Sequence, residues 1–209
     1  MCAKKRIALY GGTFDPVHAG HLEIAHRVSE LFEIEKVIFI PAQMAPHKVG
    51  WPVTEPIHRY AMLALATQDD PRLFVSTYEL DDPDRRYTVD TIEHFQRQLN
   101  DSTELFFIMG ADSWAEITTW RAWERLLTMT NHIVVARPGF EFTKDHVGAH
   151  GERVFFTDEV MNDVSATNIR RLASEGRTDE LVNLLPGPVL EYIKKYGIYR
   201  ELNEARLNS

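Results

Sequence analysis

Two histidines three residues apart, His18 and His21, are the side chains whose type and spacing most clearly suggest chemistry. They end the run Gly11–His21, which reads GGTFDPVHAGH. An imidazole N–H can donate to a phosphate oxygen, and glycines let a ligand approach the main chain closely. A histidine pair at this spacing could also be half of a metal site, or simply structural. The pattern therefore favours phosphate chemistry, with metal binding as the alternative.

The residues on either side of this run predict a strand, a glycine-rich turn and a helix, in that order. Ile7–Tyr10 is a short apolar run typical of a buried strand. Apolar side chains recur at helical spacing from Leu22 to Phe32, so we expect a helix to begin near His21. The unpaired N–H groups and the dipole at a helix N-terminus suit a phosphate. The run has neither G-x-G-x-x-G nor the Lys-Ser/Thr ending of a Walker loop, so neither common nucleotide loop explains it.

The rest of the chain alternates between predicted strands and predicted helices. Further strands are expected at 36–41, 72–77, 104–109, 131–136 and 153–157. Helices are expected to begin near 54 and 87, to include 114–127, to lead from 165 to about 176, and to cover 178–185 and 188–196. Such alternation is typical of a parallel sheet covered on both faces. We predict an α/β fold with a doubly wound, Rossmann-like, mostly parallel sheet. It would form a single domain over residues 1–209 with a small helical C-terminal segment at about 164–199.

Composition narrows the class of protein. The chain of 209 residues is 44% hydrophobic and 26% charged, which is ordinary for a soluble globular protein. Its formal net charge of −8 argues against broad non-specific binding to nucleic acid, which depends on Lys and Arg at phosphates. Cys2 is the single cysteine, and no apolar run has the length of a membrane span or a secretory signal. We expect a cytoplasmic protein without nucleic-acid or membrane partners, and a homo-oligomer is left open.

A second candidate site is the start of the helix near residue 165. Ser165 is a good N-cap, which alone is a sufficient structural explanation for it. Arg170, about one helical turn further on, would lie near the same end and could meet an anion. Ligands of doubly wound sheets collect beyond the carboxyl ends of the strands, where this helix start and Gly11–His21 both fall. Together they predict one site for a phosphorylated ligand.

Both motifs resemble those of one enzyme superfamily. The first resembles the H-x-G-H signature of nucleotidyltransferases, which attack the α-phosphorus of a nucleoside triphosphate and release pyrophosphate. The stretch VSATNIR at 164–170 resembles the I-S-S/A-T-x-I-R element with which adenylyltransferases contact ATP phosphates, with Val164 in place of the usual Ile. The resemblance implies that His18 and His21 are catalytic. It implies ATP contacts from Gly11, Gly12, Thr13, Phe14, His18, His21, Gly110, Asp112, Ser165, Thr167, Ile169 and Arg170.

Further stretches narrow the resemblance to the bacterial nicotinate-nucleotide adenylyltransferase family. They are Pro46-His47-Lys48, Tyr87–Thr91, Gly110–Asp112 and Thr119-Trp120. The resemblance runs from Ile7 to about Tyr199, with a gap at the 140–151 loop. It implies contacts to nicotinate mononucleotide from His47, Lys48, Tyr87, Thr88, Asp112, Trp120 and Arg137. Mg²⁺ is expected with ATP, through ligands that the sequence does not identify.

The chemistry of these side chains fits that substrate. Trp120 offers a flat face to a pyridine ring, and the helix start at Tyr87-Thr88 offers N–H donors to a nicotinate carboxylate. The expected reaction is in-line attack of the mononucleotide's phosphate oxygen on the α-phosphorus of ATP, with His21 donating to the charge that develops there. Two alternatives stay open. One is another adenylyltransferase, acting on nicotinamide mononucleotide or phosphopantetheine, and the other is a nucleotide-binding module without turnover.

Overall fold

A parallel sheet of six strands forms the centre of the computed structural model, which describes residues 4–43, 53–82, 87–100, 102–136, 148–158 and 164–200. The strands are β1 (Lys5–Gly12), β2 (Lys36–Pro41), β3 (Leu73–Val75), β4 (Thr103–Gly110), β5 (Asn131–Val135) and β6 (Val154–Thr157). Every neighbouring pair is parallel, in the order β3-β2-β1-β4-β5-β6. This is the Rossmann strand order, so the predicted fold class is confirmed.

Helices connect the strands and continue beyond the last of them. The α-helices of the described residues are α1 (Ala19–Leu31), α2 (Pro56–Thr67), α3 (Thr88–Gln98), α4 (Ala111–Ala115), α5 (Trp123–Met129), α6 (Ala166–Ser174) and α7 (Gly187–Tyr196). The 3₁₀ helices are η1 (Ile117–Thr119), η2 (Gly148–Arg153) and η3 (Thr178–Leu181). Within these residues, no helix combines the length and the apolar character needed to cross a bilayer.

Three predicted elements were wrong in extent. The strand predicted at 72–77 has only three residues, because β3 lies at the sheet edge and pairs with β2 alone. The helical stretch at 114–127 is broken into α4, η1 and α5, with Ala122 in the left-handed region at a φ of 52°. The helix predicted at 178–185 is the short η3, and the carbonyl of Leu184 beyond it accepts a hydrogen bond from the N–H of Ala19 at 2.9 Å.

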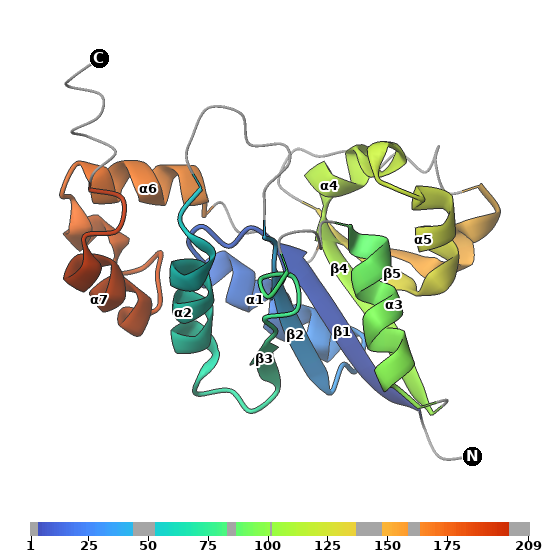
Figure 1. The fold of residues 1–209 in the computed structure, drawn as a ribbon. Helices are drawn as coiled ribbons and strands as arrows, with labels where there is room; N and C mark the ends of the chain where they lie inside the picture. Colours follow the sequence, from blue (N-terminus) through green and yellow to red (C-terminus); the bar gives the residue numbers. More distant parts are fainter. Residues whose placement is uncertain are drawn as a thin grey trace.

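Each face of the sheet has its own core, covered by different helices. Successive side chains of a strand point to opposite faces, so Ala8 and Tyr10 of β1 pack in one core and Leu9 packs in the other. The first core includes α1, α2, α6 and α7, and the second includes α3, α4 and α5. Figure 1 shows α6 and α7 beside α2 at one side of the molecule, with α4 and α5 at the other. Because both faces are buried, the strands read as continuous apolar runs.

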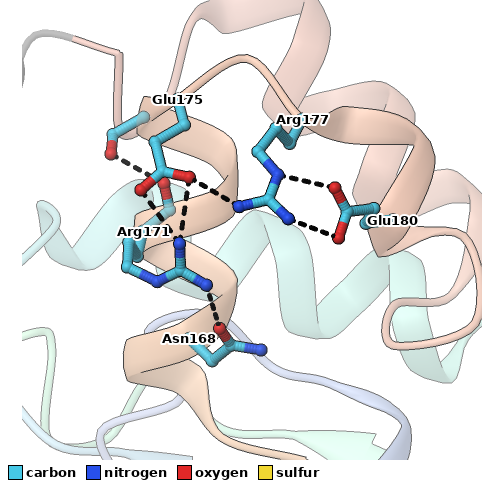
Figure 2. Close-up of polar contacts among 6 residues, drawn as sticks. Asn168, Arg171, Glu175, Arg177 and Glu180 are labelled. Carbon is cyan, nitrogen blue, oxygen red and sulfur yellow. Dashed lines mark hydrogen bonds and ion pairs between the residues drawn. The ribbon is translucent and has the colours of Figure 1, made fainter.

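The turn after α6 carries exposed ion pairs, drawn in Figure 2. Arg177 donates to Glu180 at 2.6 Å and to Glu175 at 3.0 Å, and Arg171 donates to Glu175 at 2.9 Å. Water screens such exposed pairs, so they contribute little to stability. The helical C-terminal segment is therefore held mainly by its buried apolar side chains, which join the first core; they are Ile169, Leu172, Ala173, Leu181, Leu185, Val189, Leu190 and Ile193.

An aromatic ring lies against each of the two glycines that end β1. A Cβ added to Gly11 would lie 2.9 Å from Cζ of Phe107, and one added to Gly12 would lie 2.8 Å from Cζ of Phe14. Neither glycine has a positive φ, whereas Phe14 has a φ of 51°. The two glycines are therefore not required by a left-handed backbone turn. They leave room for rings, and Phe14 adopts the left-handed conformation.

We expect Gly12→Ala to destabilise the protein and Gly110→Ala not to do so. A methyl group at residue 12 would overlap the buried ring of Phe14, and overpacking of this kind costs about 1–3 kcal/mol. Gly110 ends β4 in the corresponding place, but no atom lies within 4 Å of its added Cβ. Alanine there should be neutral or stabilise by about 0.4–1 kcal/mol through the unfolded chain. Urea unfolding measures both changes, and equal effects would contradict the packing account.

Glu79 is a buried carboxyl that packs against α3. The hydroxyl of Thr91 donates to Oε1 of Glu79 at 2.7 Å. Burial raises the pKa of Glu79 from 4.5 to about 7, and the Thr91 hydrogen bond opposes this only in part. The unfolded chain ionises this carboxyl near pH 4.5, while the folded protein keeps it protonated until about pH 7. Folding should therefore become less favourable as the pH rises through this window.

We expect Glu79→Gln to remove that loss of stability. The amide oxygen can still accept from Thr91, but the side chain no longer ionises. At pH 4.5 the variant and the wild type should unfold with similar free energies, and at pH 8 the variant should be more stable by about 1–3 kcal/mol. Guanidinium unfolding at both pH values tests this, with Glu124→Gln on the exposed side of α5 as the control for a changed surface charge. A difference that does not vary with pH would refute the raised pKa.

Candidate active site

The predicted site residues that the structure describes gather at the carboxyl edge of the sheet, around β1 and β4. These two strands pair at the centre of the sheet, where Tyr10 lies opposite Ile108. From β1 the strand order runs to β2 and β3 on one side, and from β4 to β5 and β6 on the other. Such a reversal of strand order is where doubly wound folds bind their ligands. The ends of these strands, Gly12 and Gly110, therefore mark the candidate site.

His18 and His21 lie in the first turn of α1 with their rings in contact, inclined by 30° to each other. His18 is the N-cap residue and His21 the third residue of the helix, and their ring centroids are 3.7 Å apart. The backbone N–H of His18 donates to Nδ1 of His21 at 3.2 Å. Nδ1 of His21 therefore carries no proton, and the proton of the neutral imidazole is on Nε2. This tautomer leaves His21 a hydrogen-bond donor at Nε2, as its predicted role requires.

Aromatic rings and the C-terminal segment fix the position of this histidine pair. The ring of Phe14 meets that of His21 edge-on at 5.0 Å, and the ring of Tyr10 lies beyond at 6.2 Å. The N–H of Ala19 already donates to Leu184, so this donor at the start of α1 is not available to a phosphate. The start of α1 thus offers a phosphate fewer backbone N–H donors than the sequence suggested. Nε2 of His21 and the N–H groups of the loop before the helix are among the donors to consider.

Arg59, on the buried side of α2, binds the loops at this edge from the interior of the protein. Its side chain is 1% exposed. Its guanidinium donates to the carbonyls of Thr13 at 2.9 Å, Thr54 at 2.8 Å and Gln43 at 3.3 Å. Burial lowers the pKa of Arg59, and the charge of Asp15 opposes this. Sequence reasoning missed this residue, although an arginine among the apolar positions of an amphipathic helix was a usable signal.

Asp15 and Arg170 complete a buried polar network under the same loop. The carboxylate of Asp15 accepts from the O–H of Tyr199 at 2.8 Å and from the N–H of Thr54 at 3.2 Å. Arg170, 5% exposed, donates to the carbonyl of Asp15 at 2.7 Å and to the hydroxyl of Thr167 at 3.2 Å. Burial and the Asp15 carboxylate hold the pKa of Tyr199 well above its usual value. Two guanidinium groups and one carboxylate thus give the network a net positive charge, which favours an anion above it.

The start of α6 presents hydroxyl groups rather than a buried contact. Ser165 is the N-cap residue as predicted, but its side chain makes no capping hydrogen bond. Ser165 and Thr167 are both exposed, as is Asp112 in the first turn of α4. Ile169 is fully buried, and its N–H donates to the carbonyl of Ser165 at 3.0 Å. We therefore assign Ile169 a packing role.

The predicted acceptor residues lie on the other side of the sheet edge. Tyr87 is the N-cap residue of α3, and its carbonyl accepts from the N–H groups of Asp90 at 3.0 Å and Thr91 at 3.3 Å. The N–H groups of Thr88 and Val89, at the first two helical positions, have no carbonyl within the helix to donate to. The guanidinium of Arg121 lies 4.5 Å from the centre of the Tyr87 ring. Arg121 directly follows Trp120, which is half-buried with its ring 6.5 Å from that of Phe107. Arg121 thus joins two predicted stretches, and sequence reasoning missed it.

Three predicted contacts lie outside the described residues. The described residues also show no cluster of side chains able to hold a metal ion. His47, Lys48 and Arg137 lie outside the described residues. Among the side chains that the structure places, no three His, Cys, Asp or Glu residues are grouped so that they could hold a metal ion.

Comparisons with known proteins point to one family. A family model described as cytidylyltransferase-like matches residues 9–172. Two relatives carry the name "Probable nicotinate-nucleotide adenylyltransferase". One, from Thermus thermophilus, is 42% identical over 195 residues, covering 93% of this chain and 100% of its own. The other, from Thermoanaerobacter sp., is 40% identical over 205 residues, covering 95% of this chain and 96% of its own.

A solved structure shares the fold. It is that of the Plasmodium falciparum nicotinic acid mononucleotide adenylyltransferase complexed with NaAD, with a TM-score of 0.73 at 19% identity. The match covers 93% of this chain and 97% of that one. At this identity the likeness speaks for the fold alone, and the membership rests on the closer relatives and the family model. The chain belongs to the nicotinate-nucleotide adenylyltransferase family, within the cytidylyltransferase-like proteins.

Proposed function

We propose that this protein transfers the adenylyl group of ATP to nicotinate mononucleotide, forming deamido-NAD and pyrophosphate. The observation that carries the proposal is the adjacent pair His18 and His21 at the strand-order reversal, with Nε2 of His21 left as a donor by the hydrogen bond at Nδ1. A nucleotide-binding module without turnover would not need such a donor. Relatives with this activity in their names match over nearly the whole chain, which supports the choice of both substrates.

The reaction needs charge neutralisation more than acid–base chemistry. A phosphate oxygen of nicotinate mononucleotide attacks the α-phosphorus of ATP, and the bond from this phosphorus to the oxygen bridging to the β-phosphate breaks. Pyrophosphate leaves with the bonding electron pair. The attacking oxygen is already anionic, so no side chain has to accept a proton. The obstacle is the repulsion between two anions, and Nε2–H of His21 would relieve it by donating to an α-phosphate oxygen.

The remaining ATP contacts are proposed by their place around this centre. The N–H groups of Thr13 and Phe14, His18, and the exposed hydroxyls of Ser165 and Thr167 would bind the triphosphate. Gly110 and Asp112 would orient the nucleotide, and Gly11 and Gly12 would shape its approach. Arg170 would act mainly through its charge and through its hydrogen bonds to the Asp15 carbonyl and the Thr167 hydroxyl. Mg²⁺ would enter with ATP as part of the substrate.

The acceptor would bind at the start of α3. The N–H of Thr88 would donate to the nicotinate carboxylate, with Trp120 beside the pyridine ring. Arg121 adds a cation at the ring of Tyr87 and would favour the acid over the neutral amide. His47, Lys48 and Arg137 stay predicted contacts to the mononucleotide. The absence of nucleic-acid and membrane partners, the cytoplasmic location and a homo-oligomer also stay predictions.

We expect His21→Ala to lower kcat by at least about a hundredfold, the size of a lost electrostatic donor. Glutamine at residue 21 can place an amide N–H near the position of Nε2, whereas asparagine reaches only as far as Nδ1. His21→Gln should therefore retain more activity than His21→Asn. Pyrophosphate release measures kcat, and circular dichroism checks the fold. His26→Ala, further along α1, is the control and should keep the wild-type kcat. The donor role would be wrong if His21→Ala did the same.

We expect pyrophosphate release from MgATP to be fastest with nicotinate mononucleotide. Nicotinamide mononucleotide and phosphopantetheine are the comparison acceptors, because the amide lacks the negative charge that Thr88 and Arg121 would bind. Release with another acceptor alone would retain the histidine chemistry and refute the acceptor site at α3. ATP binding without release from any acceptor would refute the proposed function.

A further inference from the structure

We propose that Arg59 is a positioning residue for adenylyl transfer, which acts by aiming the backbone N–H of Phe14 at the triphosphate. This inference rests on the proposed function and adds a residue that touches neither substrate. Arg59 lies in the first turn of α2, in a segment of the chain well separated from both histidines. Besides its charge, it acts on the site through the backbone carbonyls that its guanidinium binds.

The geometry of one peptide unit carries the proposal. The bond between Thr13 and Phe14 is trans, since the cis bond of the loop is the one that joins Asp15 to Pro16. In a trans peptide the carbonyl of one residue and the N–H of the next point in opposite directions. Nη1 of Arg59 holds the carbonyl of Thr13 from the interior at 2.9 Å. The N–H of Phe14 must therefore point away from the interior, toward the side on which the ligand is expected.

Phe14 needs such a restraint because its own conformation is unfavourable. Its φ of 51° lies in the left-handed region, which a bulky residue rarely adopts. A conformation of this kind persists only where the surroundings impose it. Arg59 holds the carbonyl before Phe14, and Arg170 holds the carbonyl of Asp15 after it, at 2.7 Å. The two guanidinium groups thus hold the peptide unit directly before Phe14 and the Asp15–Pro16 unit one residue after it.

Arg59 is suited to this role because it cannot easily move. Its other donors bind the carbonyl of Thr54 at 2.8 Å and that of Gln43 at 3.3 Å. The rigid fork of a guanidinium satisfies three carbonyls in fixed directions, which a lysine ammonium on a flexible stem does not. The ends of β1 and β2 and the start of α2 are thereby joined at one buried cation.

The test compares Arg59→Met and Arg59→Lys with Val37→Ala by steady-state pyrophosphate release from MgATP and nicotinate mononucleotide. Val37 is fully buried at the amino end of β2, opposite to the site, so its truncation loosens the core without touching the loop. We expect Arg59→Met to lower kcat/KM for ATP by about 10- to 100-fold, as small misplacements of a binding group do. Arg59→Lys should fall between Arg59→Met and the wild type. Val37→Ala should keep its kcat/KM for ATP within about threefold of the wild type despite a lower Tm. In every variant, the KM for nicotinate mononucleotide should also stay within about threefold of the wild-type value.

The results for the Arg59 variants and for the wild type distinguish a failure of the positioning role from a failure of the proposed function. Arg59 variants that remain folded by circular dichroism and lie within about threefold of Val37→Ala in kcat/KM for ATP would overturn the positioning role. If Arg59→Met does not fold, Arg59→Lys is judged by the same limit. A wild type that releases no pyrophosphate would refute the proposed function and this inference together. Wild-type turnover with unaffected Arg59 variants would refute only the inference.

Discussion

The candidate site depends on a loop whose carbonyl groups accept hydrogen bonds from buried guanidinium groups. Arg59 binds the carbonyl of Thr13, Arg170 binds that of Asp15, and the Asp15 side chain is bound in turn by Tyr199. Burying charged groups is costly unless each finds partners, and here the partners are the polar groups that the loop has to bury. The same bonds thus satisfy the cations and determine which groups of the loop face outward.

The histidine pair follows from the same construction. The loop ends at His18, whose backbone N–H donates to Nδ1 of His21 and so selects the tautomer of this imidazole. The ring of Phe14 that packs on Gly12 also meets the ring of His21, so the left-handed turn at Phe14 connects backbone shape to side-chain orientation. A glycine is required at residue 12 because a ring occupies the space of its Cβ. Backbone and side-chain donors are in this way set by one short segment.

Local patterns in the sequence were enough for the fold and for part of the site. Continuous apolar strands alternating with helices predicted the sheet, and the apolar spacing after His21 predicted the start of α1. The phosphate chemistry of His18 and His21 stays a prediction. The network under the loop could not be predicted in the same way, because its contacts are distant in sequence; Tyr199 is 184 residues from Asp15. Arg170 was predicted at the right helix start, but only the tertiary structure shows its guanidinium on the Asp15 carbonyl. The packing role of Gly11 could not be predicted locally either, because the ring against it comes from Phe107 on the neighbouring strand β4.

The two proposed parts of the site, for ATP and for the acceptor, are built on opposite faces of the sheet. The histidines and their supporting arginines come from α1, α2 and α6, which pack in the first core, whereas Tyr87 begins α3, which packs in the second. The two cores share only the strands, so the residues around the acceptor can change without repacking the loop that holds the histidines. Selection for a particular acceptor would then act mainly on α3 and on the segment that carries Trp120 and Arg121, while the buried cations keep the shared chemistry in place.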